Sequence, residues 1–251
     1  MSKNIEYEYR AILFVDLLGF KNKVNQSAFD KELLNKVFNA VNSLHKAKED
    51  NYKEPMPGGK IGVEISSFSD SLVISKDIYE PGSFFYLLNM AYFAMVEIVA
   101  NGFLARGAIT VGQLYHNNKV IFGPAMNDVY LLESKCAIYP RIIIQKNIFE
   151  NMILKDSLNG IGEDRKLYES LVQEDSDGLL FIDFLSKYHQ MDDDAYLWIL
   201  GKTKELIING IKENQGNESV LQKYEWLKNY FNDSVDNLPS NDERVPSKIY
   251  E

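Results

Sequence analysis

Two aspartates stand where short apolar runs of the sequence end or begin. Asp16 closes an apolar run in the stretch ILFVDLLGF, and a Gly-Phe pair follows it. Asp70 lies in the middle of the stretch SFSDSLVIS, between two strand-like halves. A carboxylate at the tip of a buried strand is costly to desolvate unless a charged partner meets it. An arginine, a helix N-terminus or a metal ion would meet that need.

Hydrophobic periodicity predicts the elements that must position these acids. The first half of the chain reads as a strand at 11–16, a helix at 27–48, a hairpin at 61–75, a helix at 82–102 and a hairpin at 105–123. This order matches a ferredoxin-like βαββαβ unit, so the predicted fold class is α+β. The second half reads as a helix at 124–134, a strand at 141–145, a possible edge strand at 178–185 and helices within 192–233.

The ferredoxin-like order has a geometric consequence for the two acids. A right-handed crossover makes the first and second strands parallel, with the third strand antiparallel between them. The end of the first strand then lies beside the start of the third. Asp16 and Asp70, far apart in the sequence, are therefore predicted to be neighbours at one edge of the sheet.

Two adjacent carboxylates repel each other unless a cation joins them. Oxygen ligands alone suit Mg²⁺ or Mn²⁺. The turn after Asp16 leads into a helix, and its backbone N–H groups are placed to bind phosphate oxygens. This turn comprises Leu17, Leu18, Gly19 and Phe20. The combination indicates a metal–triphosphate site, although Asp16 as a helix N-cap and Asp70 as a turn residue are the plainer alternatives.

Composition, charge and cysteine count disfavour several classes of protein. The 251 residues are 45% hydrophobic and carry a net charge of −9, which disfavours a nucleic-acid surface. The single Cys136 excludes an intrachain disulfide and a cysteine-based zinc site. We find no signal-peptide pattern and expect no membrane span of about 18 residues, so the predicted location is the cytoplasm. We expect a main domain at 1–190, a helical extension at 191–235 and a polar tail at 236–251.

In these segments the chain resembles the class III nucleotidyl cyclases. The matching stretches, in order, are LFVDLLGF, SFSDSLVIS, RGAITVGQLY and IFGPAMNDVYLLES. The resemblance implies that Asp16, Leu17 and Asp70 bind two Mg²⁺ or Mn²⁺ ions. It also implies a class III cyclase core with extra strands, and it matches Asn127 to the asparagine that orients the substrate ribose.

The departures from the family pattern concern base recognition and charge stabilisation. The two positions that read a purine base in the family are occupied here by Ser66 and Pro124. The position of the arginine that stabilises the transition state is Leu131. Arg106 or Arg141 is the expected substitute, and Arg141 is equally well explained as a surface charge at a strand end.

A narrower resemblance is to the stand-alone Pycsar uridylate and cytidylate cyclases of bacterial anti-phage defence. The stretches FGPAMNDVYLLESKCAIYPRIII and KYEWLKNYFN carry it, and it extends to about residue 232. It implies a lyase that forms cUMP or cCMP from UTP or CTP, acting as a homodimer with active sites at the interface. It also implies a separate cyclic-nucleotide effector. Two alternatives stay open, namely an adenylate or guanylate cyclase, and a catalytically dead nucleotide-binding module that regulates a partner.

Overall fold

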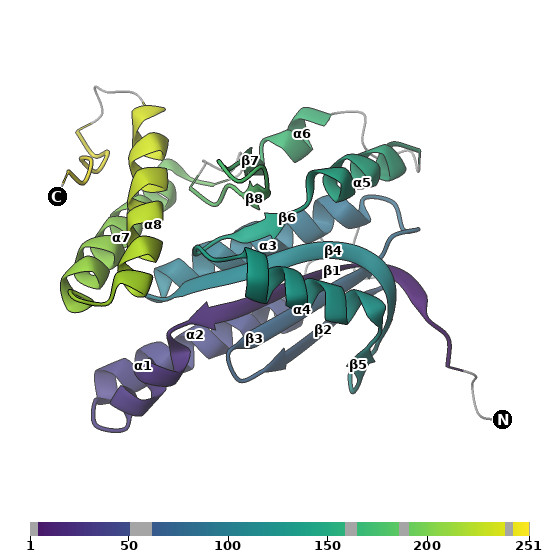
Figure 1. Ribbon diagram of the computed structural model, residues 1–251, viewed down its shortest axis with the longest axis horizontal. Helices are drawn as coiled ribbons and strands as arrows, with labels where there is room; N and C mark the ends of the chain where they lie inside the picture. The colour runs from purple at the N-terminus through teal and green to yellow at the C-terminus, as the bar shows by residue number, and fades with distance from the viewer. Residues whose placement is uncertain (1–4, 51–61, 159–164, 186–190, 239–242, 251) are drawn as a thin grey trace.

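A computed structural model describes residues 5–50, 62–158, 165–185, 191–238 and 243–250 (Figure 1). The described strands form one sheet in the order β2-β3-β1-β4-β6-β8-β7, with β5 paired to β4 outside this path. The strands are β1 (Glu8–Leu18), β2 (Val63–Phe68), β3 (Ser71–Asp77), β4 (Leu104–His116), β5 (Ile121–Phe122), β6 (Ile142–Ile144), β7 (Val172–Glu174) and β8 (Leu180–Ile182). The helices are α1 (Phe20–Ser27), α2 (Lys31–Asp50), α3 (Ser83–Ala100), α4 (Pro124–Cys136), α5 (Lys146–Leu158), α6 (Arg165–Glu169), α7 (Asp193–Glu213) and α8 (Glu218–Asp236).

The first four strands confirm the ferredoxin-like prediction. They lie in the order β2-β3-β1-β4, and every neighbouring pair among them is antiparallel. The third strand is therefore between the first and the second, as the crossover rule requires. The chain is α+β, with β6 added parallel to β4 and the β7–β8 hairpin added beyond it.

Three predicted boundaries differ from the structure. The helix expected over 27–48 is α2, which begins only at Lys31, because the side chain of Asp30 accepts hydrogen bonds from its first turn; the short helix α1 precedes it and ends at Ser27. The strand expected over 11–16 runs on to Leu18, so Asp16 lies inside β1. The strand expected at the edge is β8, but it lies between β6 and the short β7, which periodicity missed.

The two faces of β1 are covered by different helices (Figure 1). Helix α3 packs on β1, β3 and β4, whereas α4 packs on β1, β4 and β5. The ring of Phe14 makes an edge-on contact with that of Tyr130 on α4, with centroids 6.0 Å apart. Alternate side chains of a strand share a face, so Asp16 lies on the same side of the sheet as Phe14 and α4.

Helix α3 corrects the expectation that no apolar run reaches membrane-spanning length. It has 18 residues with a mean hydropathy of 1.5, which is long and apolar enough by composition alone. However, 67% of it is buried inside the fold, where it packs against the sheet and against α2 and α7. Its apolar character is explained by this central position.

The C-terminal helices pack on each other, and α7 also packs on α3. Residues 243–250 were expected to be loose, but part of this segment is held against α8. Ile249 is 5% exposed, and both its backbone N–H and its carbonyl bond to the side chain of Asn232, at 2.9 Å each. The division of the chain into domains at 190 and 235 stays a prediction.

Candidate metal and nucleotide site

The structure brings Asp16 and Asp70 together at the ends of two paired strands. Asp16 faces Ser71 across the β1–β3 ladder, and the N–H of Leu17 donates to the carbonyl oxygen of Asp70 at 3.1 Å. The Ser71 hydroxyl donates to the Asp16 carboxylate, also at 3.1 Å. The adjacency predicted from strand order is therefore confirmed.

The electrostatics of Asp16 reflect its crowded position. Burial is the largest influence and raises the pKa of its carboxyl group, and the negative charge of Asp70 raises it further. The hydrogen bond from Ser71 and the positive charge of Arg106 lower the pKa, without cancelling the rise. A bound cation would favour the ionised form of the Asp16 carboxyl group, because it offsets the repulsion between the two carboxylates.

The donor set suits a hard divalent cation that keeps part of its water shell. Two carboxylates and a hydroxyl offer only oxygen atoms, and Mg²⁺ commonly needs just one or two carboxylates besides water and substrate phosphates. No group of three or more His, Cys, Asp or Glu side chains that could hold a metal occurs among the described residues. The residues present therefore fit ions shared with a bound phosphate, not a closed protein cage.

The turn after Asp16 is shorter than the four residues expected, because β1 runs to Leu18 and Gly19 alone separates it from α1. Gly19 has φ 70° and lies in the left-handed region, which glycine adopts without strain. Helix α1 begins at Phe20, and no side chain caps its N-terminus. The N–H of Leu17 is bonded to the carbonyl oxygen of Asp70, so the N–H groups nearer α1 are the more accessible phosphate donors; the roles of Leu17, Leu18, Gly19 and Phe20 stay predictions.

Arg106 lies beside Asp16, on the neighbouring strand β4. The two residues are paired in the β1–β4 ladder, and the Nε atom of Arg106 is 2.5 Å from Oε1 of Glu133 on α4. The Arg106 side chain keeps 25% of its surface exposed, whereas Glu133 keeps 2%. Asp70 in the turn before β3, Asp16 on β1 and Arg106 on β4 thus form a row of two acids and one cation, and the buried Glu133 contacts the cation from α4.

Sequence reasoning missed Glu133, although a signal was available. The buried side of α4 includes Ala125, Val129 and Glu133, spaced four residues apart, which puts an acid on an otherwise apolar stripe. Burial raises the pKa of Glu133, and the charge of Asp16 raises it too, while Arg106 lowers it. The neighbouring cation is therefore what favours the ionised form of this buried acid.

Helix α8 contributes a second basic group near Arg106. Burial lowers the pKa of Lys223, and the positive charge of Arg106 lowers it further. Two cations close enough to influence each other make this side of the site favourable for an anion.

The surroundings of Arg141 match neither of the two interpretations from the sequence, a catalytic arginine or a surface charge. Its side chain is fully buried and forms ion pairs with Asp175 and Asp177 of the β7–β8 turn. Its guanidinium also lies over the rings of Tyr139 and Trp226, at 5.4 and 5.6 Å from their centroids. The surface-charge interpretation is wrong, because the carboxylates of the later hairpin enclose the side chain. A role beside Asp16 would require breaking both pairs, so Arg106 is the better candidate.

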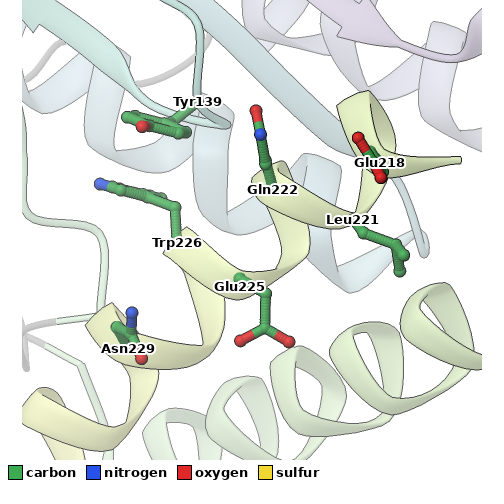
Figure 2. Close-up of a pocket in the computed structure, with 7 residues that line it drawn as sticks. All are labelled: Tyr139, Glu218, Leu221, Gln222, Glu225, Trp226 and Asn229. Atoms are coloured by element: carbon green, nitrogen blue, oxygen red, sulfur yellow. The ribbon is translucent and has the colours of Figure 1, made fainter.

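A pocket of about 410 Å³ lies beside this buried network and not beside the aspartates (Figure 2). Its walls come from the segment after α4 and from one side of α8, and the rings of Tyr139 and Trp226 stack there at 5.6 Å. The Nε1 atom of Trp226 donates to Asp175 at 2.7 Å. None of the site residues predicted from the sequence lines this pocket.

The remaining predicted residues lie on exposed or half-buried positions. Asn127 and Pro124 are exposed in the first turn of α4, and Leu131 is 48% exposed further along it. Ser66 is half-buried on β2, where its hydroxyl lies 2.8 Å from Nε2 of His116. The roles of Asn127, Pro124 and Ser66 stay predictions.

Comparison with known proteins gives similarity to solved structures only. No family model and no curated protein matches the chain. Similar structures include a bacterial light-regulated adenylyl cyclase with 12% identity and a TM-score of 0.40, covering 59% of this chain and 80% of that one. The catalytic core of a rhodopsin-guanylyl cyclase with converted specificity, in complex with ATPαS, has 18% identity and a TM-score of 0.42. The match covers 59% of this chain and 82% of that one.

A further structure of a bacterial light-regulated adenylyl cyclase has 11% identity and a TM-score of 0.40, covering 82% of this chain and 58% of that one. Identities and TM-scores this low say nothing about activity. Any function has to be argued from the residues of the site themselves.

Proposed function

We propose that the chain is a nucleotidyl cyclase that converts a pyrimidine nucleoside triphosphate, UTP or CTP, into its 3′,5′-cyclic monophosphate and pyrophosphate. The observation that carries the proposal is the row of Asp70, Asp16 and Arg106, which lie in the turn before β3, on β1 and on β4. Paired carboxylates suit divalent cations, and a cation beside them suits the charge of a reacting phosphate.

Each residue of the row has a role in the proposed reaction. Two Mg²⁺ or Mn²⁺ ions, when bound, lower the pKa of the ribose 3′-hydroxyl and neutralise the departing pyrophosphate. Asp16 and Asp70 hold these ions through their carboxylate oxygens. The backbone N–H groups at the start of α1, after Gly19, bind the β- and γ-phosphates. Arg106 stabilises the negative charge that develops on the α-phosphate.

The proposed enzyme is a homodimer with active sites at the interface. The motifs occur once in the sequence, so one chain does not contain both halves of a paired site. Asn127 is exposed on the side of α4 away from the buried stripe, where a second chain can be reached. In this proposal the partner's copy of this asparagine orients the ribose.

The product acts, in this proposal, as a cytoplasmic messenger that signals phage infection to a separate effector protein. Its support is the resemblance of residues 122–144 and 223–232 to the Pycsar cyclases. A second candidate function, a dead nucleotide-binding module that regulates a partner, is favoured by Leu131, because an apolar side chain stands where the family has an arginine. An adenylate or guanylate cyclase is the remaining alternative.

We expect a pyrimidine product when the purified chain is incubated with each of the four ribonucleoside triphosphates and Mn²⁺. Ser66 is short and neutral, and Pro124 offers no side-chain hydrogen bond. Neither side chain is therefore expected to select a purine base strongly. Mass spectrometry of the products checks this. A dominant cyclic AMP or cyclic GMP would contradict the pyrimidine assignment, and no cyclic product from any nucleotide would favour the dead module.

Mixing two inactive variants is expected to restore part of the activity if the site is shared between chains. Asp70→Ala removes a metal ligand, and Asn127→Ala removes the ribose contact from the partner. In a mixed dimer one of the two sites carries both intact residues, so about half of the sites in mixed dimers regain function. Subunit exchange is verified by native mass spectrometry, and exchange without recovery would place the whole site within one chain.

A further inference from the structure

Helix α8 runs crosswise to the strands at one end of the sheet (Figure 1), and its aromatic side chains mark its path over them. The ring of Tyr230 packs edge-on against Phe181 of β8, with centroids 5.1 Å apart. One turn earlier, the ring of Trp226 also contacts Phe181, and it lies 5.6 Å from the Cζ atom of Arg141, the residue before β6. Followed back toward its N-terminus, the helix therefore passes from β8 toward β6.

The next turn of α8 in that direction carries Lys223. This residue precedes Trp226 by three positions and so lies on the same side of the helix. Three residues advance a helix by about 4.5 Å, which is close to the spacing of neighbouring strands, about 4.8 Å. One further step across the sheet leads from β6 to β4, where Gly107 is paired with Ile142 and follows Arg106 directly. The path of the helix thus brings Lys223 to Arg106.

The electrostatics of Lys223 agree with this position. Burial is the larger influence that lowers the pKa of its ammonium group, and the positive charge of Arg106 lowers it further. Lys223 is half-buried, so part of its surface is open to a ligand. It forms no ion pair with any residue in the part of the chain that the structure describes. Lys223 is therefore a cation beside a second cation, without an acid of its own.

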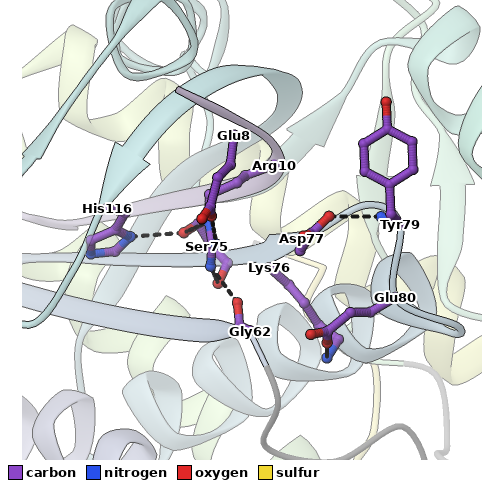
Figure 3. Close-up of polar contacts among 9 residues, drawn as sticks. All are labelled: Glu8, Arg10, Gly62, Ser75, Lys76, Asp77, Tyr79, Glu80 and His116. Carbon is purple, nitrogen blue, oxygen red and sulfur yellow. Dashed lines mark hydrogen bonds and ion pairs between the residues drawn. The ribbon is translucent and has the colours of Figure 1, made fainter. Parts of the chain in front are cut away.

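Other buried cations of the chain do have an acid of their own. Arg10 lies 2.6 Å from Glu8, and Lys76 lies 2.7 Å from Glu80 (Figure 3). The chain holds 36 acidic residues against 27 basic ones, so acids are available to neutralise a structural lysine. Two adjacent cations repel each other, and an anion bound between them removes that repulsion. The lack of an acid at Lys223 therefore points to an anionic ligand.

We propose that Lys223 binds a phosphate oxygen of the nucleoside triphosphate, next to the phosphate that Arg106 contacts. Helix α8 then forms one wall of the active site, and it does so in the same chain that supplies Asp16, Asp70 and Arg106. The several negative charges of a triphosphate offset the repulsion between the two basic side chains. This inference rests on the proposed function, because the anion is the substrate of that reaction.

Lys223→Met tests the contact, because methionine keeps most of the length of the side chain and removes its charge. With the full-length protein, Mn²⁺ and the nucleotide that it cyclises, kcat/KM is expected to fall about 30-fold, the usual worth of a hydrogen bond to a charged group. Lys223→Arg restores a cation and should recover most of this loss. Lys228→Met is the matched control, since Lys228 lies on the same helix and pairs with Glu225 at 2.6 Å. Its kcat/KM should stay within about twofold of the unaltered value.

Thermal melting separates a phosphate contact from a structural role. Removal of one of two neighbouring cations relieves their repulsion, so Lys223→Met without metal or nucleotide should have an unchanged or higher Tm. A lysine that only supports the fold would lower the Tm when it is replaced. A lower Tm together with a lower kcat/KM would therefore overturn the proposal, and so would a near-normal kcat/KM in Lys223→Met.

Inorganic tripolyphosphate with Mg²⁺ tests the contact without turnover, because it carries the phosphates and lacks the ribose and base. Calorimetric titration is expected to give a Kd about 30-fold higher for Lys223→Met than for the unaltered protein, and an unchanged Kd for Lys228→Met. Equal affinities of the unaltered protein and Lys223→Met, or no binding to either, would overturn the proposal. If no ribonucleoside triphosphate is cyclised but tripolyphosphate binds through Lys223, the proposed reaction fails and the phosphate contact stands.

Discussion

Replacing Asp16 with asparagine is expected to lower kcat by about three orders of magnitude or more, because metal ions in such sites supply several kcal/mol of transition-state stabilisation. The fold should be retained. Burial and Asp70 both raise the pKa of the Asp16 carboxyl, so its ionised form is unfavourable in the metal-free protein. A neutral isostere removes that cost and can still accept the hydrogen bond from Ser71. Thermal melting without metal should therefore show an unchanged or higher Tm.

Mn²⁺ supplies a readout that is independent of turnover. It should raise the Tm of the unaltered protein and have little effect on Asp16→Asn, since a ligand stabilises only the form that binds it. Asp77→Asn is the matched control, at the other end of β3, where its carboxylate accepts from the N–H of Tyr79. Near-normal cyclisation by Asp16→Asn, or an equal Mn²⁺ shift in both variants, would refute the metal assignment.

Replacing Arg106 with alanine is expected to lower kcat by about 10³-fold, the scale of removing a positioned arginine from a phosphoryl-transfer site. The change also removes the partner of Glu133, which is 2% exposed. A buried acid without its cation destabilises the fold by about 1–3 kcal/mol, or takes up a proton instead. Steady-state kinetics and urea unfolding measure the two effects separately.

The double variant Arg106→Ala/Glu133→Gln separates catalysis from stability. The neutral amide removes the unpaired charge, so the free energy of unfolding should return toward that of the unaltered protein while kcat stays low. Arg165→Ala, which removes an exposed arginine paired with Glu150 and Glu169, should change neither quantity appreciably. A double variant with near-normal kcat would show that Arg106 only balances the charge of Glu133.

The sequence by itself determined the order of the core strands and the meeting of the two aspartates. Apolar runs and turn residues mark each element, and the right-handed crossover leaves one place for the third strand. The adjacency of Asp16 and Asp70 follows from that order without any side-chain contact. The start of α2 was placed too early, because the side chain of Asp30 caps the helix only there, and the short helix α1 before it was missed. The strand β7 was missed, because three residues are too few to show a period.

Only the tertiary structure decided the partners of the charged and polar side chains. Periodicity reports which face of an element is buried, but it does not report which element covers that face. Arg141 is enclosed because a later hairpin brings Asp175 and Asp177 to it. Arg106 meets Glu133 because α4 packs across β4 at that row. His116 joins Ser66 to Ser75 because the register of four strands aligns residues that lie up to 50 positions apart, and register is a property of the assembled sheet.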